Sequence, residues 1–177
     1  HILVVGAGTG KEILALAALN PTWQFTAQDT SSDMLAIAKQ AFEEHGIAKR
    51  VNVIEGELDK LSTKADAALC LLVMHFLKDD GSKKQLLKNI KANLNKGANL
   101  FISDLMKPET DFEREAQITV CADLGLSDAG QAYTAQNLES EFYPLDRMRL
   151  SELLNECKYG IPKLYFKALG FSGYVVK

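Results

Sequence analysis

The sequence predicts an α/β fold in which a mostly parallel, doubly wound sheet carries helices on both faces. Short apolar runs alternate with segments whose apolar residues recur at helical spacing, and this alternation is typical of such sheets. The first run, residues 2–5, is wholly apolar, as a parallel strand buried on both faces should be. Three glycines within residues 6–10 end that run, so the chain begins with a strand, a tight loop and a helix.

The first hundred residues contain the regular part of this pattern. We expect strands at residues 2–5, 23–27, 51–54, 67–73 and 99–103, and helices at residues 11–19, 32–44 and 82–94. Ser31 or Ser32 can cap the second helix, from which Met34 is expected to point inward. Residues 95–97 are expected to form the turn after the third helix. The lysines of that helix are expected to form a solvated face: Lys83, Lys84, Lys88 and Lys91.

The regularity lapses between residues 108 and 144, where acidic residues far outnumber the one arginine. We interpret this stretch as a helical lid or insertion, with helices near 112–124 and 133–141, within a single domain that spans residues 1–177. Helical periodicity returns at Leu150. Two closing apolar runs, at 163–168 and 171–176, are separated by only two residues and are therefore expected to form an antiparallel hairpin.

Composition excludes several classes of protein. The 177 residues are 47% hydrophobic with a net charge of −3, which is ordinary for a globular domain. No apolar run approaches the ~18 residues of a membrane span, and no basic stripe favours nucleic acid, so neither partner is expected. The three cysteines lie far apart without a CxxC motif, which favours buried thiols in a reducing cytoplasm and no metal site.

The glycine loop favours a nucleotide-type ligand. A Walker A loop ending at Lys11 would need glycine at Val5 and serine or threonine at Glu12, so that motif is absent. The dinucleotide fingerprint GxGxxG also fails, because its third glycine position is Lys11. Asp29 follows the loop by ~20 residues, at the end of the second strand, where a carboxylate can accept hydrogen bonds from a ribose diol. An NAD-dependent enzyme is disfavoured but remains open.

The residues resemble the class I S-adenosylmethionine-dependent methyltransferase family. Val4-Val5-Gly6-Ala7-Gly8-Thr9-Gly10 is similar to its first motif, and Asp29-Thr30-Ser31-Ser32-Asp33-Met34-Leu35 to its second. Gly56-Glu57-Leu58 stands where the family usually has Gly-Asp and an apolar residue, so Glu57 is a departure.

The resemblance implies a Rossmann-like, seven-stranded sheet whose last strand is antiparallel, and S-adenosyl-L-methionine as the cofactor. It also implies a helical segment before residue 1 that closes over that cofactor. The residues it implies for cofactor binding are Gly6, Ala7, Gly8, Gly10, Asp29, Thr30, Met34, Gly56, Glu57, Leu58, Leu72 and Val73.

His75 is the one candidate for a catalytic base, because it follows the fourth strand, at the sheet edge where ligands of open α/β sheets bind. The alternative is a histidine that merely packs against Phe76. Asp104 is a second polar group expected at the edge of the pocket. Tyr133, Phe142 and Tyr143 are candidates to line an acceptor pocket.

We expect in-line methyl transfer to a small-molecule acceptor, while the acceptor itself and a homodimer remain open. Two alternatives stand beside this prediction. The tail resembles enzymes that make carboxy-S-adenosylmethionine for tRNA modification, but their carboxylate-binding arginine falls at Leu153, although Arg147 and Arg149 lie nearby. The other alternative is a domain that binds the cofactor and catalyses nothing.

Overall fold

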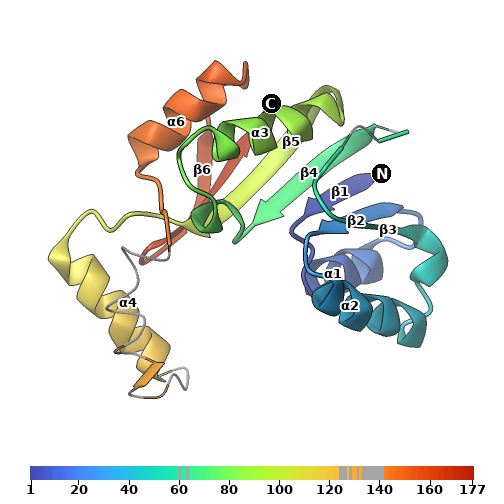
Figure 1. Ribbon diagram of the computed structural model, residues 1–177, viewed down its shortest axis with the longest axis horizontal. Helices are drawn as coiled ribbons and strands as arrows, with labels where there is room; N and C mark the ends of the chain where they lie inside the picture. The colour runs from blue at the N-terminus through green and yellow to red at the C-terminus, as the bar shows by residue number, and fades with distance from the viewer. Residues whose placement is uncertain (60, 63, 124–126, 128, 131, 133–141) are drawn as a thin grey trace. The chain divides into compact units, whose positions relative to one another are not determined.

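The computed structural model contains a seven-stranded sheet with the strand order β3-β2-β1-β4-β5-β7-β6 (Figure 1). It describes residues 1–59, 61, 62, 64–123, 127, 129, 130, 132 and 142–177. The strands are β1 Ile2–Val5, β2 Phe25–Asp29, β3 Val51–Glu55, β4 Ala65–Leu71, β5 Leu94–Leu105, β6 Lys163–Ala168 and β7 Phe171–Val176. The helices are α1 Lys11–Leu19, α2 Ser32–Glu44, α3 Ser82–Ala92, α4 Asp111–Asp123 and α6 Arg147–Glu156, with short 3-10 turns η1 Ala48–Arg50 and η2 Met74–Phe76. The predicted Rossmann-like fold is therefore confirmed.

The chain divides into two compact units, which we describe separately. Unit 1 comprises residues 1–71, 86–101 and 177, and unit 2 comprises residues 72–85 and 102–176.

Unit 1 is built around β1, which pairs in parallel with β2 on one side and with β4 on the other. All four residues of β1 are buried, which fits a central strand covered on both faces. Helices α1 and α2 contribute Ile13, Ala38 and Phe42 to the same apolar core. The hydroxyl of Ser31 accepts a hydrogen bond from the amide of Met34 and so caps α2.

Unit 2 contains the closing hairpin, in which β6 and β7 pair antiparallel over the residues expected. Helix α6 buries Leu150, Leu153 and Leu154, and the carboxylate of Asp146 caps its first turn by accepting from the amide of Arg149. All six residues of β6 are exposed.

Several local predictions are wrong. Strand β2 begins and ends two residues later than expected, and helix α3 ends at Ala92 instead of residue 94. Residues 95–97, expected as a turn, lie within β5, where Gly97 has a φ of 82° that glycine adopts without a steric cost. Strand β4 begins and ends two residues earlier than expected, and Leu72 follows it with a φ of 58°. Met34, expected to face inward, is 47% exposed.

The prediction of a solvated lysine face on α3 is also wrong at one position. Lys83 has 0% exposure, because its ammonium group donates hydrogen bonds to backbone carbonyls instead of to water. None of the helices among the described residues is long and apolar enough to cross a membrane.

Candidate cofactor loop and candidate catalytic pair

The glycine loop between β1 and α1 depends on left-handed backbone conformations. Gly6, Gly8 and Gly10 have φ values of 67°, 51° and 79°, a region that residues with a Cβ rarely adopt. At Gly10 the packing imposes a second requirement, because a Cβ there would lie 2.5 Å from Cζ of Phe42. This loop therefore packs closely on α2.

Asp29 ties the loop to the end of β2. One carboxylate oxygen accepts from the amide of Gly8 at 2.7 Å, and the other accepts from the amide of Ser31 at 2.9 Å. Each carboxylate oxygen has a second lone pair, so these bonds leave capacity for the hydroxyls of a ribose. The side chain is partly exposed, as a ligand group must be.

Other residues implied for the cofactor lie near the glycine loop or the end of β2. The amide of Gly56 donates to the carbonyl of Asp29 at 2.9 Å. Thr30 is exposed, and the sulfur of Met34 lies 3.7 Å from the position a Cβ on Gly8 would take. The exposure of Met34 therefore places an apolar side chain beside the loop, where a flat ring could pack.

The remaining implied residues differ in their accessibility. Glu57 is exposed and Leu58 is fully buried, while Ala7 is buried beneath the loop. Leu72 and Val73 belong to unit 2, where Leu72 is half exposed.

Gln28 is a residue that sequence analysis missed. Its side-chain amide donates to the carbonyl of Gly56 at 2.5 Å, and its side-chain oxygen is buried with no partner among the described residues. The partly exposed carboxylate of Asp29 and this buried side-chain oxygen together fit an adenosine-type ligand.

In unit 2, His75 and Asp104 form a buried pair. Nδ1 of His75 lies 2.5 Å from a carboxylate oxygen of Asp104, and the two residues are 6% and 5% exposed. In the neutral imidazole, an Nδ1–H that donates to this carboxylate leaves a lone pair on Nε2. Within the described part of the chain, no residue bonds to Nε2. The sequence singled out both residues but gave no reason to pair them.

Aromatic rings hold the imidazole on its other sides. The ring centroids of Phe76 and Phe142 lie 4.1 Å and 5.3 Å from that of His75. The amide of Tyr143 also donates to the carbonyl of His75 at 2.7 Å. The expected packing against Phe76 is therefore present together with the carboxylate contact.

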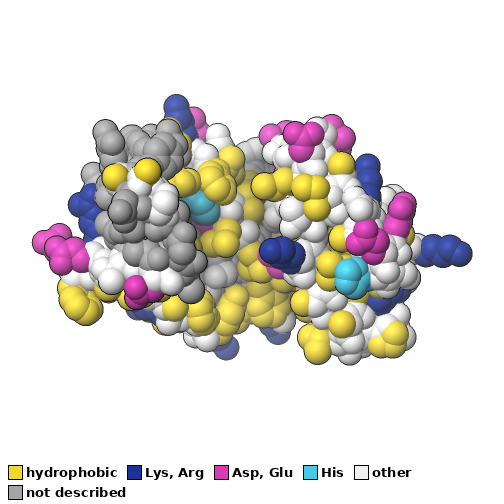
Figure 2. Space-filling model, turned by 90° about the horizontal axis from the view of Figure 1, so that it is seen from below, with side chains coloured by type: hydrophobic (Ala, Val, Ile, Leu, Met, Phe, Trp, Pro, Cys, Tyr) yellow, Lys and Arg dark blue, Asp and Glu magenta, His cyan; other side chains and the backbone are white. Residues whose placement is uncertain are grey.

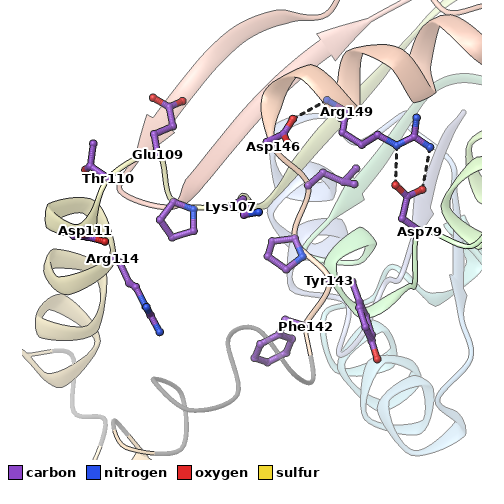
Figure 3. A pocket seen from close by; sticks show the side chains of 13 residues that line it. Asp79, Lys107, Glu109, Thr110, Asp111, Arg114, Phe142, Tyr143, Asp146 and Arg149 are labelled. Atoms are coloured by element: carbon purple, nitrogen blue, oxygen red, sulfur yellow. Dashed lines mark hydrogen bonds and ion pairs between the residues drawn. The ribbon is translucent and has the colours of Figure 1, made fainter.

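A cavity of about 630 Å³ lies within unit 2 (Figure 3). Phe142 and Tyr143, two of the candidates for an acceptor pocket, line this cavity, while Tyr133 lies outside the described residues. The other lining residues are Asp79, Lys107, Pro108, Glu109, Thr110, Asp111, Arg114, Pro144, Leu145, Asp146 and Arg149. Phe142 contacts the His75 ring and also lines the cavity, so it connects the two.

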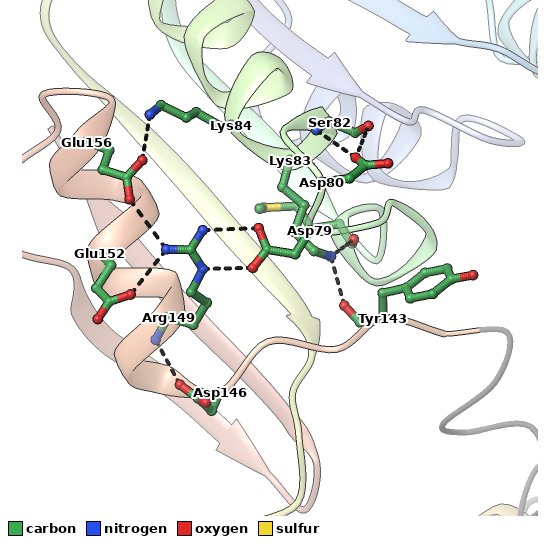
Figure 4. A network of polar contacts seen from close by, with 11 residues as sticks. Asp79, Asp80, Ser82, Lys83, Lys84, Tyr143, Asp146, Arg149, Glu152 and Glu156 are labelled. Carbon is green, nitrogen blue, oxygen red and sulfur yellow. Dashed lines mark hydrogen bonds and ion pairs between the residues drawn. The ribbon is translucent and has the colours of Figure 1, made fainter.

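Arg149, at one side of this cavity, is surrounded by carboxylates (Figure 4). Its guanidinium contacts Asp79 at 2.7 Å, Glu152 at 3.1 Å and Glu156 at 3.3 Å. The hydrogen bond from Arg149 lowers the pKa of the Asp79 carboxyl below its ordinary value. This arginine is therefore already committed to acidic partners of its own unit.

The fold and the glycine loop define a Rossmann-like α/β protein of the class that binds nucleotide-type cofactors. A family model described as a methyltransferase domain matches residues 3–100, which is more than half of the chain. The chain belongs to this family of methyltransferase domains.

Solved structures agree with this assignment at the level of the fold. An O-methyltransferase family 2 protein from Planctomyces limnophilus superposes with a TM-score of 0.73 at 18% identity, over 99% of this chain and 49% of that one. The N,N-8-amino-8-demethyl-D-riboflavin dimethyltransferase from Streptomyces davawensis superposes with a TM-score of 0.74 at 19% identity, over 99% of this chain and 48% of that one. The chain thus spans about half the length of these proteins. An uncharacterised protein of Synechococcus sp. is 36% identical over 82 residues, which are 45% of this chain and 20% of that protein.

Proposed function

We propose that this domain transfers the methyl group of S-adenosyl-L-methionine to a hydroxyl oxygen of a small-molecule acceptor. The observation that carries the proposal is the buried His75–Asp104 pair, which suits an acceptor that must lose a proton. The similar structures include an O-methyltransferase and an N,N-dimethyltransferase, so they do not decide between oxygen and nitrogen.

The cofactor would be held by the residues around the glycine loop. Asp29 would accept from the ribose hydroxyls, Thr30 and Met34 would flank the adenine, and Glu57 and Leu58 would lie near its amino group. Gly6, Ala7, Gly8 and Gly10 would surround the methionine portion, and Leu72 and Val73 would lie toward its methyl end. The bound cofactor supplies a methyl group already activated by its sulfonium.

His75 would act as the general base. The bond from Nδ1–H to Asp104 fixes the tautomer, so Nε2 can take the proton of the acceptor hydroxyl. The carboxylate then stabilises the imidazolium, and the rings of Phe76 and Phe142 restrict the orientation of the imidazole. A positioned base of this kind contributes roughly 100- to 10,000-fold in rate.

The surroundings of His75 favour an organic acceptor with apolar surface. The cavity of about 630 Å³ has the size of small-molecule sites, and aromatic and proline side chains form part of its wall. Phe76, beside His75, is 59% exposed. Figure 2 shows one face of the molecule, on which many apolar side chains lie among the charged ones.

No observation favours the synthesis of carboxy-S-adenosylmethionine. Leu153 is buried and apolar, and the guanidinium of Arg149 is held by three carboxylates. A group so engaged cannot also form a bidentate contact with a ligand carboxylate.

Calorimetric titration of the full-length protein with S-adenosylhomocysteine tests the cofactor assignment. We expect micromolar binding, no binding of NAD, and a loss of roughly tenfold or more in Asp29→Ala, because one charge-assisted contact is worth ~1.5–3 kcal/mol. Asp33→Ala removes an exposed carboxylate four residues away and should bind like the parent protein. Preference for NAD, or no binding of either ligand, would contradict the proposal.

A further inference from the structure

Lys83, the second residue of α3, is a fully buried cation close to the candidate base. Its exposure is 0%, whereas the next residue, Lys84, reaches the surface and pairs with Glu156 at 2.6 Å. The two lysines are adjacent on one helix and identical in chemistry. Lys83 stands four and seven residues before the buried Leu87 and Ile90, so it lies on the buried side of α3, where its ammonium group still finds polar partners.

The ammonium of Lys83 joins two segments of main chain (Figure 4). It donates to the carbonyl of Met74, the residue before His75, and to the carbonyl of Tyr143 at 2.8 Å. The amide of Tyr143 in turn donates to the carbonyl of His75. The backbone of the His75 turn and the backbone at Tyr143 are thus bonded to each other directly and through Lys83.

Burying the ammonium group of Lys83 lowers the free energy of unfolding, so its presence indicates a role other than stability. Removing an ammonium from water costs several kcal/mol, which the hydrogen bonds to carbonyls and the charge of Asp79 help to offset, and an apolar residue of similar volume would avoid that cost. What an apolar side chain cannot do is hold two carbonyls in a fixed relation. The contacts of Lys83 therefore indicate a role in geometry and not in packing alone.

We propose that Lys83 is a positioning residue that orients His75 toward the acceptor. It fixes the carbonyl before His75 and the residue after Phe142, whose ring lies against the imidazole. A displacement of the imidazole by about 1 Å is enough to reduce the rate roughly 100-fold. This inference rests on the proposed role of His75 as the base.

The test compares Lys83→Met with Lys84→Met, which removes the neighbouring exposed charge. Lys83→Met should lower kcat tenfold or more, with the affinity for S-adenosylhomocysteine within twofold of the parent value. The low-field proton resonance of His75 Nδ1–H, identified by its loss in His75→Asn, should broaden or shift in Lys83→Met. Lys84→Met should change neither kcat nor the resonance.

Two results would overturn the role of Lys83. One is a kcat within twofold of the parent in Lys83→Met with an unchanged His75 resonance, and the other is an equal loss of cofactor affinity. The resonance does not depend on turnover, so it separates this inference from the proposed function. That function fails by itself if His75→Asn retains full kcat.

Hydrogen exchange on the parent protein provides a measurement that needs no folded variant. If Lys83 holds the two segments together, the amide of Tyr143, which donates to the carbonyl of His75, should exchange as slowly as the hydrogen-bonded amides within helix α3. Exchange of the Tyr143 amide at the rate of an open loop would overturn the proposal.

Discussion

The glycine loop of unit 1 and the His75 turn of unit 2 reach a defined geometry in different ways. The loop is fixed by backbone conformation at three glycines and by one carboxylate, Asp29, 21 residues from Gly8. The His75 turn is fixed by side chains from distant parts of the chain, with separations of 29 residues to Asp104 and 60 residues between Lys83 and Tyr143. The first arrangement is visible as a sequence motif, and the second exists only after folding.

The largest expected effect of a substitution is on kcat, at the His75–Asp104 pair of the His75 turn. His75→Asn should lower kcat roughly 100- to 10,000-fold, because the group that accepts the proton is removed. Asp104→Asn should lower kcat less, by roughly 10- to 100-fold, because the imidazole remains but its tautomer is no longer fixed. Steady-state kinetics with a reactive hydroxyl acceptor measures both.

Cofactor titration provides the control for these variants. Both should bind S-adenosylhomocysteine within a few-fold of the parent protein, because neither residue is among those assigned to the cofactor. Equal kcat in the parent and in His75→Asn would mean that the acceptor loses its proton without this base.

A smaller effect, on stability, is expected at Gly10. Gly10→Ala should lower the free energy of unfolding by roughly 2–4 kcal/mol, because the new Cβ meets Phe42 in a left-handed backbone conformation. Gly46→Ala is a matched control, since Gly46 has a φ of 68° but nothing within 4 Å of its Cβ position. Its cost should be only about 1 kcal/mol.

Urea unfolding of the two alanine variants separates packing from backbone strain. The difference between them measures the contact of the loop with α2. If both variants lose the same stability, the close approach of Gly10 to Phe42 contributes nothing.

The same contrast explains how much could be predicted from the sequence. Strand β1, helix α1, the cap of α2 and the closing hairpin follow from local periodicity, capping residues and turn residues, and all were predicted. Residues 95–97 were not, because glycine is compatible with both a turn and an irregular strand, and only strand pairing decides.

The candidate catalytic residues show more clearly which contacts the sequence does not predict. His75 and Asp104 were named as separate polar groups, because nothing in a spacing of 29 residues reveals a contact between them. Lys83 was assigned to a solvated face with Lys84 because of its charge, although it stands four and seven residues before the buried Leu87 and Ile90 on α3. Burial of a charge depends on carbonyls supplied by other segments, so it is a tertiary property.

The smallest effect is expected at the ion pair of Asp79 with Arg149, which is also built from distant residues but is partly exposed. The bond from Arg149 lowers the pKa of Asp79 in the folded state, so its stabilising contribution is present above the ordinary aspartate pKa of about 4. It is lost as the pH falls through the lowered pKa. Asp79→Asn should therefore lower Tm slightly at neutral pH, and the difference from the parent should shrink in acid.

Melting curves of the parent and of Asp79→Asn across this pH range, repeated in an Arg149→Met background, provide the measurement. In that background Asp79→Asn should no longer lower Tm, and an undiminished effect would show that Asp79 acts through another partner.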